Sequence, residues 1–323
     1  MENICVSIII PILNEEKYIS KCIESVLTQD YPKKNLELLL IDGESEDNTI
    51  KIVNEYINKY SFIRLLSNSR KTVQYALNIG ISNAVGKYIV RMDAHAEYAD
   101  NYVSKCIEYL EKTDAVNVGG PMIASWKNNA QRVVAAAYHS DFALGGGKNH
   151  KEGYEGYADT VFLGAFKRDY IVSMGMYDER LPRSEDDDLN FRISENGDKI
   201  FITPEIKSKY YPRSSYKQLF KQYYEYGLWK VAVIKKHKRP ARISHLVPMM
   251  FVAFLLLSMF LPKILSLPII CAYILLDAYY SFKSPYLDNF IDKIKLIYVH
   301  FIIHISYGLG FWHGIFKFIS TKW

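Results

Sequence analysis

The first 120 residues of the chain alternate between two hydrophobic patterns. Short unbroken apolar runs, the first covering residues 6–10 and stopping at Pro11, are typical of buried strands. Between these runs lie segments with apolar residues at every third or fourth position, which indicate amphipathic helices. The runs predict strands at 6–10, 36–41, 62–66 and 88–92. The periodic segments predict one helix at 17–29, a second between the second and third strands that ends at residue 57, and a third at 73–84. Apolar strands that alternate with helices predict an α/β fold, with a mostly parallel sheet and helices on both faces.

The pattern becomes less regular after residue 120. Residues 145–151 contain three glycines followed by polar residues, which predicts a mobile loop. Further strands are expected at 161–166 and 199–202, and between them an acidic cluster at 184–188 is followed by apolar residues at helical spacing. The regular α/β pattern therefore extends, with one irregular interruption, to about residue 206.

The C-terminal part of the chain contains three long apolar segments. Residues 246–261 carry no charge, residues 264–278 carry only Asp277, and residues 295–316 are uncharged after the first position. Each segment approaches the length that crosses a hydrocarbon core of about 30 Å. We expect a membrane hairpin followed by a third span. The alternative is a helical hairpin that lies in the membrane interface.

Charge is distributed unevenly along the chain. The net charge is +5 overall, with +10 in residues 207–242 and +3 in residues 243–323, which leaves −8 for residues 1–206. A uniformly basic nucleic-acid-binding protein would not show this pattern, so nucleic acid is excluded as a partner. A basic segment before an apolar tail instead indicates an anionic membrane surface, and the positive-inside rule places that segment in the cytoplasm.

The basic segment also contains many aromatic residues. Residues 214–234 alternate lysine with tyrosine, phenylalanine and tryptophan, which are side chains suited to the headgroup level of a bilayer. We therefore expect an interfacial helix at this position. The alternative is an ordinary helix packed on the catalytic domain. The four cysteines are widely spaced and match no zinc or redox motif, which excludes a disulfide scaffold.

Carboxylates follow three of the predicted strands. Glu15, Asp42 and Asp93 stand where the first, second and fourth strands end. In open parallel sheets, ligands bind beyond the carboxyl ends of the strands. A carboxylate at Asp42 can accept hydrogen bonds from a pyrimidine N–H or from ribose hydroxyls, or it can simply cap the next helix.

Asp93, Ala94 and His95 form the second candidate site. Side chains two residues apart in an extended turn point the same way, so Asp93 and His95 can reach one divalent ion. A carboxylate with an imidazole suits Mn²⁺ better than Mg²⁺, because Mg²⁺ prefers oxygen ligands. The alternative for this short motif is a plain surface turn.

The third candidate is the run from Glu185 to Asp188. Four adjacent carboxylates repel one another, so a solvated acidic loop is one interpretation. The apolar residues that follow indicate that the run opens a partly buried helix, whose N-terminus favours negative charge. A carboxylate held there at the wall of a cleft can act as a general base.

Seven segments, in order along nearly the whole chain, carry a recognisable combination of motifs: VSIIIPILNEEKYI, LLLIDGESEDNT, ALNIGISNAVGKYIVRMDAHAEY, FLGAFKRDYI, SEDDDLNFRI, YYPRSSYKQLFKQYYEYGLWK and HFIIHISYGLGFWHG. With these motifs the chain resembles glycosyltransferase family 2, whose nucleotide-sugar-binding fold is known as GT-A. Within that family it looks like the membrane-bound, succinoglycan-type exopolysaccharide transferases.

The resemblance implies roles for particular residues on the donor side of the site. Pro11 and Glu15 match the first nucleotide-contacting loop, although Leu13 stands where many members have an aromatic residue. Asp42 matches the carboxylate that reads uracil or ribose, and Gly43 replaces a frequent second aspartate.

The metal-binding and catalytic motifs are matched in the same way. Asp93 and His95 match the metal-binding D-x-D motif, with His95 in place of its second aspartate. Glu185 and Asp186 match the catalytic acidic pair, with Asp186 as the base. Gln222 and Trp229 lack the spacing and the arginine of the Q-x-x-R-W motif of processive synthases, which favours the addition of one sugar at a time.

These expectations combine into a domain organisation. We expect a GT-A catalytic domain over residues 1–212, a basic aromatic interfacial segment over 213–242, and a membrane region with two to three helices over 243–323. The implied protein is a multi-pass protein of the cell membrane, with its catalytic domain in the cytoplasm. The loop at 145–151 is expected to close over the donor.

The implied activity is that of a metal-dependent inverting glycosyltransferase. It would use Mn²⁺ or Mg²⁺ to move a sugar from a nucleotide diphosphate donor, a UDP-hexose, to a lipid-linked glycan in the synthesis of a cell-surface polysaccharide. Other polysaccharide-assembly proteins are expected as partners. Two alternatives stay open: transfer of the sugar to a polyprenyl phosphate, and a non-catalytic membrane scaffold. A dinucleotide oxidoreductase is disfavoured because no G-x-G-x-x-G follows the first strand.

Overall fold

The structure is a computed structural model that describes residues 5–144, 146–321 and 323. The chain divides into two compact units, which are described separately below. Unit 1 comprises Met1–Ile123 and Lys151–Tyr210, and unit 2 comprises Ala124–His150 and Tyr211–Trp323. Residues 124–150, which the sequence pattern assigned to the catalytic domain, therefore group with the C-terminal helices. The chain leaves unit 1 and returns to it, and composition along the chain does not reveal such a boundary.

Unit 1 is built on an eight-stranded sheet. The strand order is β3-β2-β1-β4-β9-β6-β10-β8. The strands are β1 (Val6–Ile12), β2 (Leu36–Asp42), β3 (Ile63–Ser67), β4 (Tyr88–Arg91), β6 (Ala115–Gly120), β8 (Gly156–Ala158), β9 (Phe162–Lys167) and β10 (Lys199–Ile202). Pairing is parallel from β3 to β4 and between β6 and β10, and antiparallel where β9 and β8 join. The predicted mostly parallel α/β sheet is thus confirmed.

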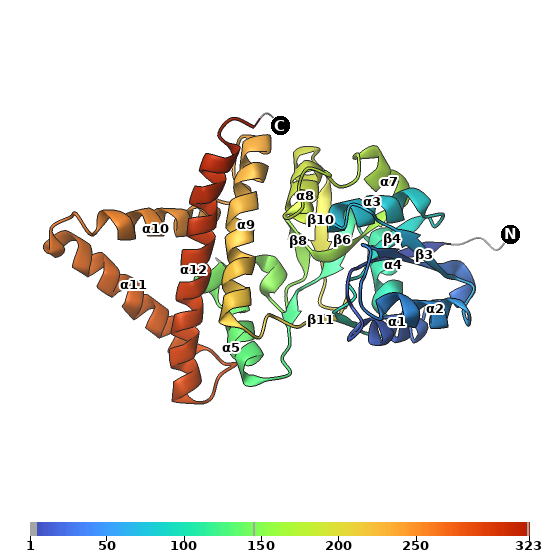
Figure 1. Cartoon of the computed structure of the whole chain (residues 1–323), viewed down its shortest axis with the longest axis horizontal. Helices are drawn as coiled ribbons and strands as arrows, with labels where there is room; N and C mark the ends of the chain where they lie inside the picture. Colours follow the sequence, from blue (N-terminus) through green and yellow to red (C-terminus); the bar gives the residue numbers. More distant parts are fainter. Residues whose placement is uncertain (1–4, 145, 322) are drawn as a thin grey trace. The chain divides into compact units, whose positions relative to one another are not determined.

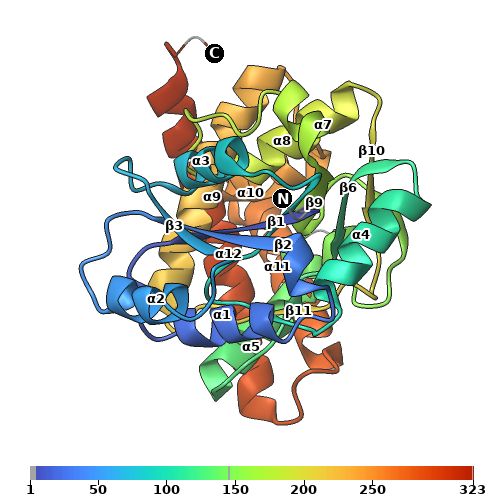
Figure 2. The ribbon, with the colours of Figure 1, turned by 90° about the vertical axis from the view of Figure 1, so that its right-hand side faces the viewer.

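Helices cover both faces of this sheet (Figure 2). One apolar core packs the sheet against three helices: α1 (Ile19–Leu27), α2 (Thr49–Ile57) and α4 (Tyr102–Lys112). A second core packs the opposite face against three others: α3 (Val73–Asn83), α7 (Arg168–Ser173) and α8 (Glu185–Glu195). Alternate residues of β1 point to opposite faces, so Ile8 and Ile10 enter the first core and Ile9 enters the second.

Three details of unit 1 differ from the expected elements. β1 continues through Pro11 to Ile12, in register with β2, because a parallel strand can lose one N–H donor near its end and still pair. β6 was not predicted, since its sequence contains Asn117 and two glycines in place of an apolar run. A small antiparallel pair joins β5 (Glu97–Tyr98) to β11 (Ser208–Tyr210).

Unit 2 is helical in its described part. Its helices are α5 (Asn129–Tyr138), α6 (Asp141–Leu144), α9 (Tyr216–His237), α10 (Val247–Leu257), α11 (Lys263–Lys283) and α12 (Phe290–Phe318), with 3₁₀ turns η2 (Lys148–His150) and η3 (Ile243–Leu246). The remaining short elements of the chain are β7 (Ile123–Ala124) and η1 (Lys33–Asn35). α11 and α12 are long and apolar enough to cross a membrane, whereas α10 is shorter (Figure 1).

Polar contacts explain why residues 124–150 belong to unit 2. The Asn129 amide donates to Asp292 Oδ1 (2.8 Å), and Arg132 Nε donates to the carbonyl of Tyr286 (2.9 Å). Nε2 of His304 also lies 3.1 Å from the carbonyl oxygen of Phe142. The predicted loop at 145–151 falls in this region. Gly145 lies outside the described residues, and closure over a donor stays a prediction.

Candidate active site

The loops after β1 and β2 are tied together at the carboxyl edge of the sheet. The backbone N–H of Asn14 donates to Ser45 Oγ (2.9 Å), and the N–H of Glu46 donates to Asn14 Oδ1 (2.8 Å). The N–H of Glu15 donates to Thr49 Oγ1 (2.7 Å). Because β1 and β2 are parallel neighbours, their ends meet here, as the sequence analysis expected.

Asp42, at the end of β2, is buried and already hydrogen-bonded. Its carboxylate accepts from the Ser45 N–H (3.2 and 3.1 Å) and from the Ser45 hydroxyl (2.6 Å). The N-cap residue of α2 is Asn48, so Asp42 shapes the preceding turn and does not cap the helix. Pro11 pairs in register with Ile41, beside Asp42. A nucleotide-binding role for Asp42 and Pro11 stays a prediction.

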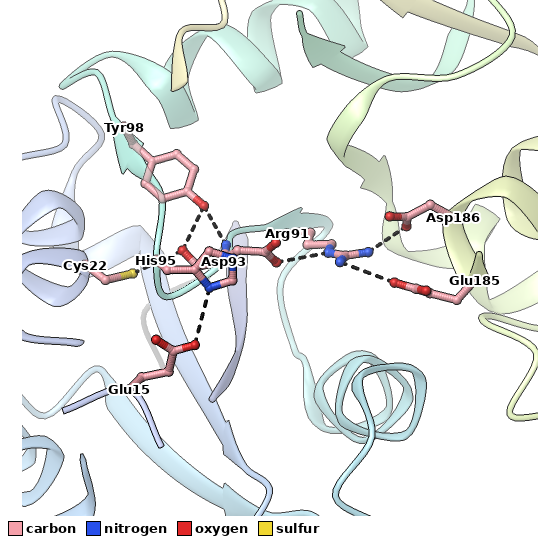
Figure 3. A network of polar contacts seen from close by, with 8 residues as sticks. All are labelled: Glu15, Cys22, Arg91, Asp93, His95, Tyr98, Glu185 and Asp186. Carbon is pink, nitrogen blue, oxygen red and sulfur yellow. Dashed lines mark hydrogen bonds and ion pairs between the residues drawn. The ribbon is translucent and has the colours of Figure 1, made fainter. Parts of the chain in front are cut away.

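Asp93 and His95 follow β4, next to the end of β1 (Figure 3). The Tyr98 hydroxyl fixes this turn, because it accepts from the N–H of Asp93 (2.5 Å) and donates to the carbonyl of Asp93 (3.1 Å). Nδ1 of His95 lies 3.3 Å from Glu15 Oε1. Three of the predicted site residues therefore stand together: Glu15, Asp93 and His95. Glu15 and His95 are 80 residues apart in sequence.

The donor atoms of Asp93 and His95 suit a divalent cation. A carboxylate oxygen and an imidazole nitrogen are both ligands that Mn²⁺ accepts. Among the described residues, no group of three or more His, Cys, Asp or Glu side chains is arranged to hold a metal ion. Two protein ligands fit a cation that completes its shell with water and with oxygens of a bound diphosphate.

Arg91, the last residue of β4, connects this turn to the acidic start of α8 (Figure 3). Its guanidinium donates through Nη1 to Asp186 Oδ1 (2.6 Å), through Nη2 to Glu185 Oε1 (3.4 Å) and through Nε to Asp93 Oδ1 (3.4 Å). The Arg91 side chain is only 7% exposed. One buried arginine thus holds the proposed metal ligand and the proposed catalytic pair in a single cluster.

The four carboxylates at the start of α8 have different environments. Asp188 is fully buried and accepts from Arg192 Nε (3.0 Å), a pairing within the helix. Glu185 and Asp186 turn toward Arg91. Asp187 is half-buried. Two of the four carboxylates, those of Glu185 and Asp186, therefore face Arg91.

The pKa of Asp186 is raised above its usual range, chiefly because packed atoms keep water from the carboxylate. Arg91 opposes this rise, and the negative charges of Glu185 and Asp93 add to it. The side chain is 38% exposed, so solvent also screens the charge. A carboxylate with a raised pKa and an open side has the properties of a general base.

Sequence reasoning missed two members of the cluster, Arg91 and Tyr98. A signal for Arg91 was present, because a charged residue ends an otherwise apolar buried strand, two positions before Asp93 and on the same face. No local signal marks Tyr98, because its role depends on folding back onto the Asp93 backbone.

The parallel-rich sheet, with helices on both faces and carboxylates and a histidine at its strand ends, is a fold of the GT-A class. The fold matches that of a solved structure, the mannosyltransferase PcManGT from Pyrobaculum calidifontis in complex with GDP-Man and Mn²⁺. The TM-score is 0.62 at 16% sequence identity, over 97% of this chain and 87% of that chain. At this identity the likeness shows the fold alone.

The chain belongs to glycosyltransferase family 2, since the sequence model of the protein family described as Glycosyl transferase family 2 matches residues 7–172. It is 33% identical, in an alignment 327 positions long that covers 98% of each chain, to the dolichyl N-acetyl-alpha-D-glucosaminyl phosphate 3-beta-D-2,3-diacetamido-2,3-dideoxy-beta-D-glucuronosyltransferase of Methanococcus voltae. It is also 29% identical over 245 residues to the succinoglycan biosynthesis protein ExoA of Rhizobium meliloti (strain 1021), covering 75% of this chain and 74% of that protein. The resemblance drawn from the sequence motifs is confirmed at the level of the family.

Proposed function

We propose that the protein transfers one sugar, with inversion, from a nucleoside diphosphate sugar to a hydroxyl group of a lipid-linked saccharide. The donor expected from Asp42 and the resemblance is a UDP-hexose. The product would serve the synthesis of a cell-surface polysaccharide or glycan. The observation that carries the proposal is the Arg91 cluster, which joins Asp93 on the donor side to Asp186 on the acceptor side.

In the proposed reaction, Asp186 accepts the proton of the acceptor hydroxyl as its oxygen attacks the anomeric carbon. A new glycosidic C–O bond forms, and the bond from the anomeric carbon to the diphosphate oxygen breaks on the opposite face. One displacement of this kind inverts the anomeric configuration and needs no covalent enzyme intermediate. Arg91 positions the Asp186 carboxylate and favours its ionised form.

Asp93 and His95 are the residues that would hold a divalent cation, Mn²⁺ or Mg²⁺. When bound, such a cation supplies positive charge against the diphosphate leaving group. Glu15 lies against the His95 ring and can fix its orientation, as outer carboxylates do for metal-bound histidines. The tyrosine hydroxyl of Tyr98 holds the backbone of the Asp93 turn in place.

The relative from Methanococcus voltae supports a lipid-linked acceptor, because its name specifies a dolichyl-linked N-acetylglucosaminyl phosphate. We propose that the present enzyme also works at a membrane, with its catalytic unit on the cytoplasmic side, as the basic segment at 207–242 suggests. Two helices, α11 and α12, are long and apolar enough to cross, which is compatible with multi-pass attachment.

A donor and acceptor screen tests the proposal. Membranes that contain the protein are incubated with radiolabelled nucleotide sugars, and product is measured in the lipid extract. Transfer that requires a lipid-linked saccharide supports the proposal. Transfer to polyprenyl phosphate alone would favour the polyprenyl-phosphate alternative, and a purified protein that neither hydrolyses nor transfers any donor would favour a non-catalytic scaffold.

A further inference from the structure

Within unit 2, α9 lies along α12, whose N-terminal part extends beyond the start of α9 (Figure 1). The rings of Tyr216 and Tyr298 are 5.4 Å apart at the start of α9, and the Tyr224 hydroxyl lies 2.6 Å from His313 Nδ1 further along. Near the helix ends, Lys235 Nζ donates to the carbonyl of Ile319 (2.7 Å). The two helices therefore run in the same direction, and α9 lies beside α12 over its whole length.

Glycines make this contact unusually close. A Cβ atom added to Gly227 would lie 2.0 Å from the carbonyl oxygen of Tyr307, and one added to Gly310 would lie 2.0 Å from that of Tyr224. Gly314 likewise leaves only 2.6 Å to the carbonyl of Leu228. At these positions the backbones of α9 and α12 are in direct contact. If α12 entered a bilayer, α9 would therefore have to enter it too.

α9 is poorly suited to a hydrocarbon environment. Its charged residues are spaced along its whole length: Lys217, Lys221, Glu225, Lys230, Lys235 and Lys236. With a rise of about 1.5 Å per residue, they recur every ~6–8 Å, so no placement across a core of about 30 Å avoids them. Lys217 and Lys221 are exposed. Each charge near the bilayer centre costs about 2.5–3.5 kcal/mol on insertion scales.

The hairpin formed by α10, α11 and the turn between them has the opposite character. It projects from α12 on the side away from α9 (Figure 1). Its turn is strongly exposed and apolar, with Met259 71%, Phe260 87% and Ile264 81% exposed. Only 17% of the most apolar part of α11 is buried. The one acid of the hairpin, Asp277, is fully buried and turned toward His300 of α12 (2.6 Å).

The first arm of the hairpin is too short to cross a bilayer. α10 has 11 residues, or about 16 Å, which is roughly half of a hydrocarbon core, whereas α11 has 21 residues and is long enough, so α10 limits the depth that the hairpin reaches. Its start is fixed against the C-terminal part of α12, where Trp312 Nε1 donates to the carbonyl of Met249 (3.1 Å). Lys263 at the turn also keeps the hairpin shallow, because its ammonium must reach a polar layer.

An exposed apolar stripe on α12 completes the membrane-facing surface. Ile291, Tyr298 and Phe316 lie near one line along the helix, at intervals of 7 and 18 residues, and are 66%, 53% and 68% exposed, although one edge of Tyr298 also contacts Tyr216 of α9. This stripe suits a helix that lies in the plane of the interface.

From these observations we infer that unit 2 binds a single leaflet of an anionic bilayer: the α10–α11 hairpin enters and leaves on the same side, α12 lies along the membrane surface, and α12 does not cross. This inference replaces the multi-pass expectation and holds whether or not the proposed catalytic function is right.

Topology mapping on the full-length chain tests the inference. Reporters at the N-terminus and at the C-terminus should lie on the same side of the membrane. A cysteine introduced as Met259→Cys, with Cys271→Ser, should resist an impermeant maleimide from both sides until detergent is added. A C-terminus opposite to the N-terminus would show that α12 crosses, and labelling of position 259 from the far side would show that the hairpin crosses. Either result overturns the inference.

A second experiment tests the hairpin as the anchor. Membranes are washed with about 1 M salt, which screens surface electrostatics. In this wash, the double variant Phe260→Asp with Ile264→Asp should move at least half of the protein from the membrane pellet to the soluble fraction. The control is Val172→Asp, an exposed apolar residue of α7 in unit 1, which should stay in the pellet. The circular dichroism spectrum and a cooperative thermal unfolding transition of the released protein verify that it is folded. If the folded double variant stays in the pellet as the control does, the hairpin is not the anchor.

Discussion

Two buried charge clusters, one in each unit, are built differently. In unit 1 a single guanidinium, that of Arg91, faces the carboxylates of Asp93, Glu185 and Asp186. In unit 2 a single carboxylate, that of Asp277, faces the imidazole of His300, with the Ser281 hydroxyl donating to the same oxygen (3.1 Å). The first cluster has an excess of negative charge, whereas the second contains one acid and one base.

Exposure separates the two clusters further. Asp186 and His95 each keep 38% of their side-chain surface open to solvent, while His300 and Asp277 are at 0% and 1%. An open, acid-rich cluster can receive a cation and a proton. A closed pair can do neither without unfolding, and its role is to join two helices in one register. The proposed active site is the open cluster, which combines an uncompensated charge with access to solvent, whereas the closed pair has neither.

The largest effect is expected for the base in the open cluster. Asp186→Asn keeps the shape and removes the proton acceptor, so turnover should fall by about 10²–10⁴-fold while donor affinity stays close to that of the wild type. Turnover and a donor-binding titration measure the two effects. Asp187→Asn is the matched control and should cost much less. If Asp187→Asn is inactive, or if Asp186→Asn is inactive because it no longer binds the donor, then Asp186 is not the base.

The closed pair should affect stability and leave chemistry unchanged. Asp277→Leu leaves His300 buried without its partner, which should lower the free energy of unfolding by about 3 kcal/mol. Replacing both residues, Asp277→Leu with His300→Leu, should recover at least half of the loss, because only the neutral Ser281 hydroxyl then loses its partners. Denaturant titration in detergent measures both variants. Turnover per folded molecule should not change, and a specific loss of turnover would contradict a purely structural pair.

Removing the charge at the centre of the open cluster should shift its pH dependence. Asp186 must be ionised to act as a base, so activity is present above its raised pKa and is lost as pH falls through it. Arg91 lowers that pKa, so Arg91→Met should move the acid limb of kcat/KM upward by about one pH unit. Arg91→Lys keeps a positive charge and should move it less. Equal profiles for both variants would show that the charge of Arg91 does not act on the base.

The smallest effect concerns the choice of metal. His95→Asp replaces an imidazole by a carboxylate, which should shift the preference from Mn²⁺ toward Mg²⁺ by a few-fold. The ratio of activities with the two ions, after removal of bound metal by a chelator, measures this shift. If the wild-type protein stays active after treatment with the chelator, the activity does not depend on a metal. If the ratio is unchanged in the variant, His95 is not a ligand.

Local patterns in the sequence determined most of the catalytic fold. Unbroken apolar runs at 36–41 and 88–92 specified strands buried on both faces, and the carboxylates after them marked the ligand edge, because ends of parallel strands meet at one edge. The motifs around Asp93 and Asp186 carried the family assignment. The antiparallel orientation of β9 and the formation of β6 depend on the strands that they pair with, since a single segment determines neither its orientation nor its pairing partner.

The tertiary structure alone decided which charges meet and which helices stay together. Arg91 and Asp186 are 95 residues apart, and only the folded sheet brings them within 2.6 Å. Hydropathy treats α12 as an independent apolar segment, but the glycine contacts bind it to the charged helix α9, and the two must share one environment. The physical reason is the same in both cases: sequence patterns report the preference of one segment, whereas pairing energies depend on partners that only the fold supplies.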